Sequence, residues 1–212
     1  MSGPLLILGS GGHAKVLVDA LLLGSRPIAG LVDAACERIG STLLGLTVLG
    51  DDSIVSRYSH SEIQLVNGVG SIRSNLLRRQ IFERFTAAGY AFAQVLHPSC
   101  LVADSALLGE GVQVMAGAII QAGSQVGKNT IINTGAIVDH DCHVGAHAHL
   151  APGVTLSGGV RVGDGAHIGT GAIVIQGVRI GEGSLVGAGA VVVRDVPPES
   201  TVMGVPAREA QS

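Results

Sequence analysis

The chain has 212 residues, of which 47% are hydrophobic, and its formal net charge is -3. This length is enough for one or two domains with cores of their own. The weak negative charge gives no reason to expect binding to nucleic acid or to a membrane surface. No apolar run approaches the roughly 20 residues that a membrane helix needs, so we expect no membrane insertion.

The N-terminus lacks the basic flank and the cleavage site of a signal peptide. Cys36, Cys100 and Cys142 are odd in number and form no C-x-x-C pair, which favours reduced thiols over a disulfide framework or a zinc ribbon. We therefore expect a cytoplasmic protein.

The first half of the chain reads as alternating strands and helices. We expect a buried strand over 5–8, a helix over about 14–23 and a second strand that ends at Asp33. Between the first strand and the helix, "GSGGHA" fits the pattern G-x-G-x-x-A, and Asp33 follows about 20 residues later. A glycine turn at a helix N-terminus offers backbone N–H groups to a phosphate. This segment predicts a nucleotide site.

Three further elements complete the first domain: a strand over 64–69, a helix near 74–88 and a last strand near 90–95. Together they form about half of a dinucleotide-binding fold, which is enough for one nucleotide. All five aromatic residues precede residue 93, and glycine becomes frequent from about residue 101. We predict a Rossmann-like α/β domain over 1–96, joined near His97 and Pro98 to a different architecture over 97–212.

The second domain is a repeat with a period of six residues. All 16 residues reached by steps of six from Val102 to Val192 are aliphatic. The residue three positions later is glycine in 11 of 15 hexads, and the next one is always small. Glycine suits a tight corner and a branched aliphatic residue fills the interior of a short strand. Three hexads make one triangular coil, so the pattern resembles the left-handed parallel β-helix of the hexapeptide-repeat proteins.

Stacking of the coils places residues 18 apart above one another. The position before each interior aliphatic residue faces outward, and one such column is mostly apolar: Ile119, Ile137, Thr155, Ile173 and Val191. An apolar outer stripe needs a partner. Hexapeptide proteins are typically homotrimers with active sites between subunits, and the resemblance implies that this face packs around a threefold axis.

Four of the eight histidines fall in "VDHDCHVGAHAHL", residues 138–150. The hexad register puts His140 and Asp141 on the turn after the apolar stripe. His143 and His149 take outward strand positions, with His167 one coil above His149, and we expect all of them on an external surface near the subunit seam. For His143 and His147 we expect solvated positions without a role in the site.

The "HD" pair, a histidine nine residues after the first, and "VMGVPAR" near the C-terminus together resemble bacterial nucleotide-sugar acetyltransferases. This group contains the bacillosamine-pathway N-acetyltransferase and the sialic acid O-acetyltransferases. The resemblance implies transfer of acetyl from acetyl-CoA to an amino group of a nucleotide-linked dideoxyaminosugar, for surface glycan synthesis. No metal is implied.

Transfer of an acetyl group requires that the attacking amine lose a proton, and a neutral imidazole accepts protons well near pH 7. His140 is the candidate general base, and Asp141 would orient its ring. The family commonly has Glu beside this histidine, so the shorter Asp141 puts its reach in doubt. By the resemblance, His149 contacts the sugar or the acetyl group. Cys142 takes the small corner position that points inside the coil, so we expect a structural role.

The resemblance also assigns binding residues. Acetyl-CoA would lie along the β-helix between subunits, largely on backbone groups, and a backbone N–H at Gly158 would polarise the thioester carbonyl. "GVPAR" would close the β-helix, and its arginine could meet the phosphates of the coenzyme. The matching positions for acetyl-CoA are Gly158, Thr170, Ala188, Gly204, Pro206 and Arg208. The matching positions for the nucleotide sugar, besides His149, are Gly11, Gly12, His13 and Asp33, with Gly70 and Ser71 in the loop "GVGSIRSN".

Other readings remain open. Ala34 stands where some relatives carry a second acidic residue, so the base could be uridine, guanosine or cytidine. The same scaffold supports O-acetylation of sialic acid or a related sugar. Gamma-class carbonic anhydrases bind zinc through histidines on this β-helix, although they need neither a nucleotide domain nor a coenzyme A motif. A non-enzymatic β-helix assembly with a regulatory nucleotide domain is a further alternative.

Overall fold

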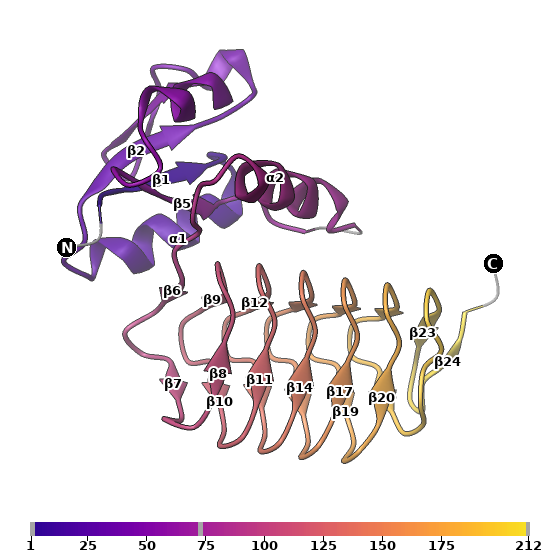
Figure 1. Cartoon of the computed structure of the whole chain (residues 1–212). Coiled ribbons are helices and arrows are strands. Elements are labelled where there is room, and N and C mark those ends of the chain that lie inside the picture. Colours follow the sequence, from indigo (N-terminus) through magenta and orange to yellow (C-terminus); the bar gives the residue numbers. More distant parts are fainter. Residues whose placement is uncertain (1–2, 72–73, 211–212) are drawn as a thin grey trace.

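The computed structural model describes residues 3–71 and 74–210, and it has an α/β domain lying above a prism of short parallel strands (Figure 1). The α/β domain contains one sheet in the order β3-β4-β2-β1-β5, in which only β3 is antiparallel to its neighbour. Its elements are β1 Leu5–Leu8, α1 Gly12–Leu22, β2 Ile28–Val32, β3 Thr42–Leu43, β4 Leu46–Gly50, β5 Gln64–Asn67 and α2 Leu76–Ala87. Two short 3-10 segments lie at Cys36–Arg38 and Asp52–Arg57.

The two helices cover opposite faces of this sheet. Alternate side chains of the buried strand β1 point to opposite sides: Leu5 and Ile7 belong to the cluster that contains Leu17 of α1, whereas Leu6 belongs to the one that contains Phe82 of α2. The predicted Rossmann-like layering is therefore confirmed, with β1 at its centre.

Two features of this domain differ from the prediction. The hairpin of β3 and β4 was not expected. Its turn residues Leu44 and Gly45 both adopt positive φ, as type I′ turns require. Leucine rarely adopts this conformation, so the sequence carried only one glycine as a turn signal. The expected strand near 90–95 is also divided. Phe92 makes an isolated bridge to Leu65, and the following strand, β6 Val95–Leu96, pairs with the prism.

The prism has three faces built from stacked strands, which have two residues each except β23 with three. The face below the α/β domain, here called the covered face, comprises β6, β9 Gln113–Val114, β12 Ile131–Ile132, β15 His149–Leu150, β18 His167–Ile168, β21 Leu185–Val186, β23 Thr201–Met203 and β24 Arg208–Glu209. The apolar face comprises β7 Leu101–Val102, β10 Ile119–Ile120, β13 Ile137–Val138, β16 Thr155–Leu156, β19 Ile173–Val174 and β22 Val191–Val192. The open face comprises β8 Leu107–Leu108, β11 Gln125–Val126, β14 His143–Val144, β17 Arg161–Val162 and β20 Arg179–Ile180.

The predicted hexad register is confirmed along the prism. Partners in neighbouring coils are 18 residues apart, as in Ile119 opposite Ile137 and His149 opposite His167. Every aliphatic residue of the column from Val114 to Val192 is buried, and Val102 and Leu108 at the first coil are half-buried. This is the predicted left-handed parallel β-helix, and its core is the aliphatic column.

The chain reverses after the last coil. Gly204 has φ +95, and β24 then runs antiparallel to β23, with Met203 opposite Arg208. Neither α1 nor α2 could cross a membrane, and the described residues contain no other helix with the length and apolar character to do so.

Candidate active site

The four histidines of the run 138–150 point in different directions around the prism. His140 lies at the corner between the apolar and open faces, and His143 lies on the open face. His147 lies at the corner between the open and covered faces, and His149 on the covered face. The imidazoles therefore do not converge on one point. Within residues 3–71 and 74–210, no group of three His, Cys, Asp or Glu side chains is arranged to hold a metal ion.

His140 and Asp141 form a pair at their corner. The Nδ1–H of His140 donates to Oδ2 of Asp141 across 2.9 Å, which leaves Nε2 with a free lone pair. Asp141 has φ +57, and this left-handed backbone turns the short carboxylate back toward the preceding imidazole. Asp141 thus reaches the imidazole even though its side chain is one methylene shorter than the Glu that the family commonly has.

Two glycines, each one coil away, make room for this pair. A Cβ on Gly123 would lie 2.5 Å from Oδ1 of Asp141. A Cβ on Gly158 would lie 2.5 Å from Nε2 of His140 and 2.6 Å from its Cε1. The imidazole ring therefore rests on the backbone of Gly158, and its free nitrogen lies over the residue for which the sequence predicts a thioester contact.

Electrostatics favour a basic imidazole at this corner. The hydrogen bond to Asp141 raises the pKa of His140 above its ordinary value of 6.5, and the charge of Asp139 adds to the effect. The ring is 56% exposed, so it can take up and release protons directly.

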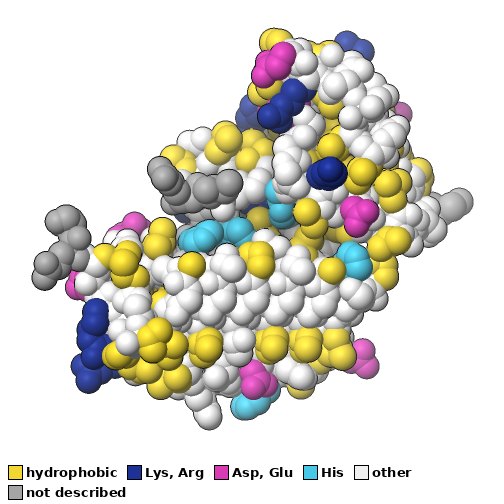
Figure 2. All heavy atoms as spheres, turned by 180° about the vertical axis from the view of Figure 1, so that it is seen from behind, with side chains coloured by type: hydrophobic (Ala, Val, Ile, Leu, Met, Phe, Trp, Pro, Cys, Tyr) yellow, Lys and Arg dark blue, Asp and Glu magenta, His cyan; other side chains and the backbone are white. Residues whose placement is uncertain are grey.

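His149 is not on an external surface, contrary to the prediction. It does occupy the outward position of its strand, but the α/β domain covers this face and leaves the residue only 8% exposed. Figure 2 shows histidine side chains gathered in the hollow between the two domains. The hexad pattern gives the face on which a residue lies, but it gives no information on what another domain places over that face.

The hydrogen bonds of His149 fix its tautomer. Oδ1 of Asn133 accepts from the backbone N–H of Thr134 at 2.8 Å, so its amide nitrogen is the atom that faces Nε2 of His149, at 3.2 Å. Nε2 therefore accepts, and the proton resides on Nδ1, which donates to the hydroxyl oxygen of Ser71 at 2.5 Å. Burial, with the charges of His167, His13 and Arg78, lowers the pKa of His149 to about 3.

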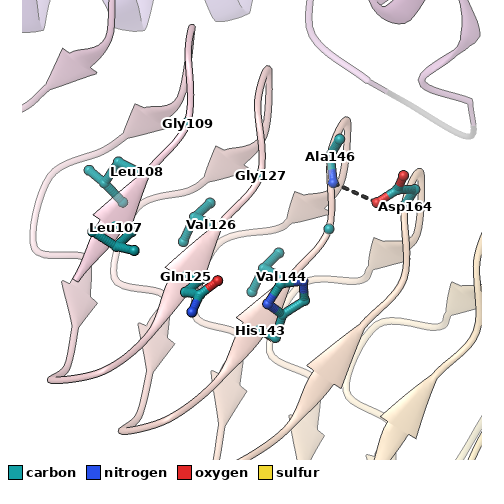
Figure 3. A pocket seen from close by; sticks show the side chains of 11 residues that line it. Leu107, Leu108, Gly109, Gln125, Val126, Gly127, His143, Val144, Ala146 and Asp164 are labelled. Carbon is teal, nitrogen blue, oxygen red and sulfur yellow. Dashed lines mark hydrogen bonds between the residues drawn. The ribbon is translucent and has the colours of Figure 1, made fainter.

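His147 also differs from the prediction, because it is 5% exposed rather than solvated. Its Nδ1 bonds the Asn129 side chain at 3.0 Å and its ring packs edge-on against Phe82 of α2. It thus belongs to the packing between the domains. His143 is exposed as expected, and it lines a hollow of about 310 Å³ on the open face. Figure 3 shows it in line with Leu107 and Gln125 of the preceding coils.

The glycine turn lies at the start of α1, where the sequence places it. Gly11 is the N-cap, it makes no side-chain cap bond, and the first turn carries no acidic residue. A Cβ on Gly12 would meet nothing within 4 Å, so the helix start faces open space. This arrangement is suited to an anion such as a phosphate.

Asp33 is tied to its own chain by four donors. Its carboxylate accepts from N–H and Oγ–H of Ser10, from N–H of Ala35 and from Nη1 of Arg38. Burial alone would raise the pKa of this carboxyl, but the bonds from Ser10, Ala35 and Arg38 outweigh it and the pKa is lowered. The guanidinium of Arg38 is thereby held 3.9 Å from the position of a Cβ on Gly11.

His13 connects the glycine turn to the prism. Its Nε2–H donates to Oε1 of Gln113 at 2.7 Å, and a Cβ on Gly70 would come within 3.1 Å of its own Cβ. Burial and the charge of Arg78 lower the pKa of His13 to about 4, so its ring is neutral. His13, Gly70 and Ser71 lie together at the junction of the domains. Ile72 and Arg73 of the same predicted loop lie outside the described residues.

The predicted acetyl-CoA positions divide between two corners. Gly158 lies beside His140, between the apolar and open faces. Thr170 and Ala188 are exposed at the corner between the covered and apolar faces, one coil apart. Gly204 and Pro206 lie in the reversal before β24, and Arg208 is exposed on β24. The two corners border opposite edges of the apolar face.

Sequence reasoning missed several polar residues of the domain junction. Their shared feature is that they come from separate segments and meet only in the folded chain. They are Asn67, Arg78, Gln113, Asn129 and Asn133. Arg38, which pairs with Asp33 inside the α/β domain, was missed as well. One signal was available in the sequence: polar side chains at outward positions of the covered face, such as Gln113, can indicate a polar contact with another domain.

Two family models match the chain. The model described as the PglD N-terminal domain matches residues 4–85, and the model for bacterial transferase hexapeptide (six repeats) matches residues 123–158 and 159–194. A search of curated proteins found no match.

The chain is also similar to solved structures along its whole length. It is 42% identical to perosamine N-acetyltransferase from Caulobacter crescentus, solved with CoA and GDP-perosamine; the match covers 100% of this chain and 99% of that one, with a TM-score of 0.92. It is 38% identical to the acetyltransferase domain of PglB from Neisseria gonorrhoeae in complex with acetyl coenzyme A, with 99% and 100% covered and a TM-score of 0.91. WeeI from Acinetobacter baumannii is 26% identical, with 98% and 99% covered and a TM-score of 0.84.

Proposed function

Because the chain belongs to the bacterial nucleotide-sugar acetyltransferases of the hexapeptide superfamily, we propose that it acetylates the amino group of a nucleotide-linked dideoxyaminosugar for surface glycan synthesis. The acetyl donor is acetyl-CoA. The observation that carries the proposal is the corner where Nε2 of His140 lies over Gly158 while Nδ1 bonds Asp141. We also place the reaction in the cytoplasm, since all three cysteines are free thiols.

The residues at this corner fit a thioester. Gly158 presents backbone without a side chain, so an extended acyl chain can approach closely and its carbonyl can accept from a backbone N–H. The N–H of the next residue, Gly159, is already bonded to the carbonyl of His140 at 2.9 Å. We therefore assign the N–H of Gly158, rather than that of Gly159, as the donor to the thioester carbonyl.

His140 is the general base in this mechanism. Asp141 holds the proton on Nδ1, so Nε2 accepts a proton from the amine as the nitrogen attacks the acetyl carbon. The imidazolium that forms is stabilised by the adjacent carboxylate. The proton then passes to the solvent or to the departing thiolate. No covalent acetyl-enzyme is needed, and the buried Cys142, 1% exposed, is not a nucleophile.

The nucleotide diphosphate belongs at the start of α1. Gly11, Gly12 and His13 supply the open helix terminus, and Arg38 adds a cation held in place by Asp33. These groups together suit a phosphate. With the phosphates there, the sugar would extend toward the hollow between the domains, where Gly70, Ser71 and His149 lie.

A single chain does not unite these parts. The nucleotide domain lies over the covered face, which borders the corner of Thr170 and Ala188, whereas His140 lies across the apolar face at the other corner. The column of Ile119, Ile137 and Ile173 runs along that apolar face, and Ile173 is 43% exposed. We propose a homotrimer in which the apolar faces surround the threefold axis and His140 of one subunit meets the covered-face edge of its neighbour.

Subunit complementation tests this arrangement. Gly12→Asp would put a carboxylate where the phosphate binds, and open space around Gly12 allows the chain to fold. Chains with Gly12→Asp or His140→Ala alone should each lose most of the wild-type activity. If a site takes His140 from one subunit and the nucleotide domain from another, each mixed trimer regains about one of its three sites, which is on the order of a quarter of all sites in a random co-expressed mixture. No recovery in isolated mixed trimers would show that each site lies within one chain.

The acceptor is tested by thiol release from acetyl-CoA. GDP-perosamine, UDP- and CMP-linked aminosugars, and the matching hydroxy sugars form the panel. We expect release with an aminosugar and none with its hydroxy counterpart. Release only with hydroxy sugars, including sialic acid, would replace N-acetylation by O-acetylation on the same scaffold.

A further inference from the structure

Arg78 is a fully buried cation at the junction of the two domains. The side chain extends from α2, is 1% exposed, and none of the ion pairs among the described residues includes it. Nη1 donates to the carbonyls of Asn67 and Val69, both at 2.8 Å, and Nε approaches the carbonyl of Asn129 at 3.4 Å. Burial lowers the pKa of Arg78 to about 9, so it remains charged near neutral pH.

We propose that Arg78 is a positioning residue of the nucleotide-sugar site, which fixes the segment from Asn67 to Ser71 against the prism and thereby places Ser71 and His149. The inference rests on the proposed function for the identity of the ligand. Arg78 itself does not touch the reacting atoms.

The contacts of this segment support the proposal. The side-chain amide of Asn67 donates to the carbonyl of Arg78 at 2.9 Å and approaches the Asn129 side chain at 3.2 Å. The carbonyl of Asn67 accepts from both Arg78 and Gln113. The bond to Val69 then lies two residues before Ser71, whose hydroxyl meets His149. One guanidinium thus joins α2, the segment after β5 and the prism.

The positive charge has an effect that a neutral donor would lack. Among the described residues, the charges that lower the pKa of His149 are those of His167, His13 and Arg78, and the charge that lowers the pKa of His13 is that of Arg78. Burial is the main reason why both imidazoles are neutral, and the charge of Arg78 acts in the same direction. A neutral amide could make similar bonds at a smaller desolvation cost. The charge of Arg78 therefore adds to the effect of burial in keeping both rings neutral.

Arg78→Gln removes the positive charge and the guanidinium that bonds the carbonyls of Asn67 and Val69. Arg78→Lys keeps the charge but lacks the planar guanidinium. For Arg78→Gln we expect the KM for the nucleotide sugar to rise about tenfold or more, as for a lost charged hydrogen bond. The KM for acetyl-CoA should stay within about twofold, because that ligand lies at another corner. Arg78→Lys should give an intermediate KM. Arg79→Gln is the matched control, since its side chain is exposed and pairs with Glu83.

A second readout needs no substrate and so separates this inference from the proposed function. NMR titration of the imidazole Cε1–H signals between about pH 4 and about pH 8 should show His13 and His149 unprotonated over most of that range in the wild type. In Arg78→Gln both should protonate at higher pH, and in Arg78→Lys they should stay near wild type.

The outcomes distinguish positioning from mere packing. A folded Arg78→Gln protein with wild-type KM for the nucleotide sugar and unchanged titrations would overturn the proposal, even if its melting temperature falls. If Arg78→Gln does not fold, a folded Arg78→Lys protein with wild-type KM for the sugar overturns it equally. Shifted titrations in a protein that acetylates none of the aminosugars would instead retain the electrostatic role and reject the proposed function.

Discussion

Two histidines nine residues apart, His140 and His149, sit in opposite environments. His140 is exposed at a corner of the prism, is paired with Asp141, and has a raised pKa. His149 lies under a second domain, its neighbours among the described residues are neutral or positive, and its pKa is lowered to about 3. The difference shows that residue type and spacing do not assign a role to an imidazole. Its cover and its partners decide between a proton acceptor and a fixed hydrogen-bonding group.

The largest expected effect comes from removing the exposed ring. His140→Ala should lower kcat by roughly 10² or more, because the amine then loses its proton to water, while acetyl-CoA still binds. Steady-state kinetics and calorimetric titration with acetyl-CoA measure the two quantities. His143→Ala is the control, since it removes an exposed imidazole on another face and should leave kcat unchanged. A full rate for His140→Ala would remove it from the mechanism.

The fold was open to prediction from sequence because its signal is local and repeated. Each hexad from Val102 to Val192 carries the same aliphatic, corner and outward positions, and each coil packs on the next. The pairing of His140 with Asp141 was expected from the family resemblance, whereas their position at the corner followed from the same register. The hairpin of β3 and β4 did not, because its turn lacks a second glycine.

The candidate site could be predicted only in part. The hexad register gives the face for His147 and His149, but their burial depends on Phe82 and Ser71, which come from the other domain. The role that we assign to Arg78 depends on contacts from three separate segments. Such contacts join residues far apart in the sequence, so a periodic sequence pattern does not predict them.

An intermediate effect is expected at Gly158, where a substitution can displace the ring of His140 without changing either histidine. The methyl group of Gly158→Ala would lie 2.5 Å from Nε2 of His140, so the ring must move. A displaced base should lower kcat about tenfold or more. The backbone of Gly158 is not in the left-handed region, so the chain itself tolerates alanine.

Kinetics and a melting curve together test this substitution. The KM for the nucleotide sugar should remain near wild type, because the hollow between the domains is unaltered, and the melting temperature should change little. Unaltered kcat would mean that the ring position over Gly158 has no part in proton transfer.

The smallest effect on the rate is expected for Asp141→Asn, which should instead change the pH dependence of kcat/KM. Since Asp141 raises the pKa of His140 above 6.5, the wild-type kcat/KM should fall as the pH drops through a value above 6.5, where the base becomes protonated. Loss of the carboxylate lowers that pKa, so the acidic limb should move to lower pH. Because the pair is exposed, the loss of rate above the limb should be less than about fivefold.

His149 and His13, by contrast, should not produce this limb. The pKa of His149 is about 3 and that of His13 about 4, so both rings are already neutral throughout the pH range in which the limb lies. A pH profile of kcat/KM for wild type and Asp141→Asn, with His149→Asn as the control variant, therefore separates the two environments. The limb should shift in the first variant and stay in the second, and a limb that follows His149 instead would transfer the role of base from the corner to the covered face.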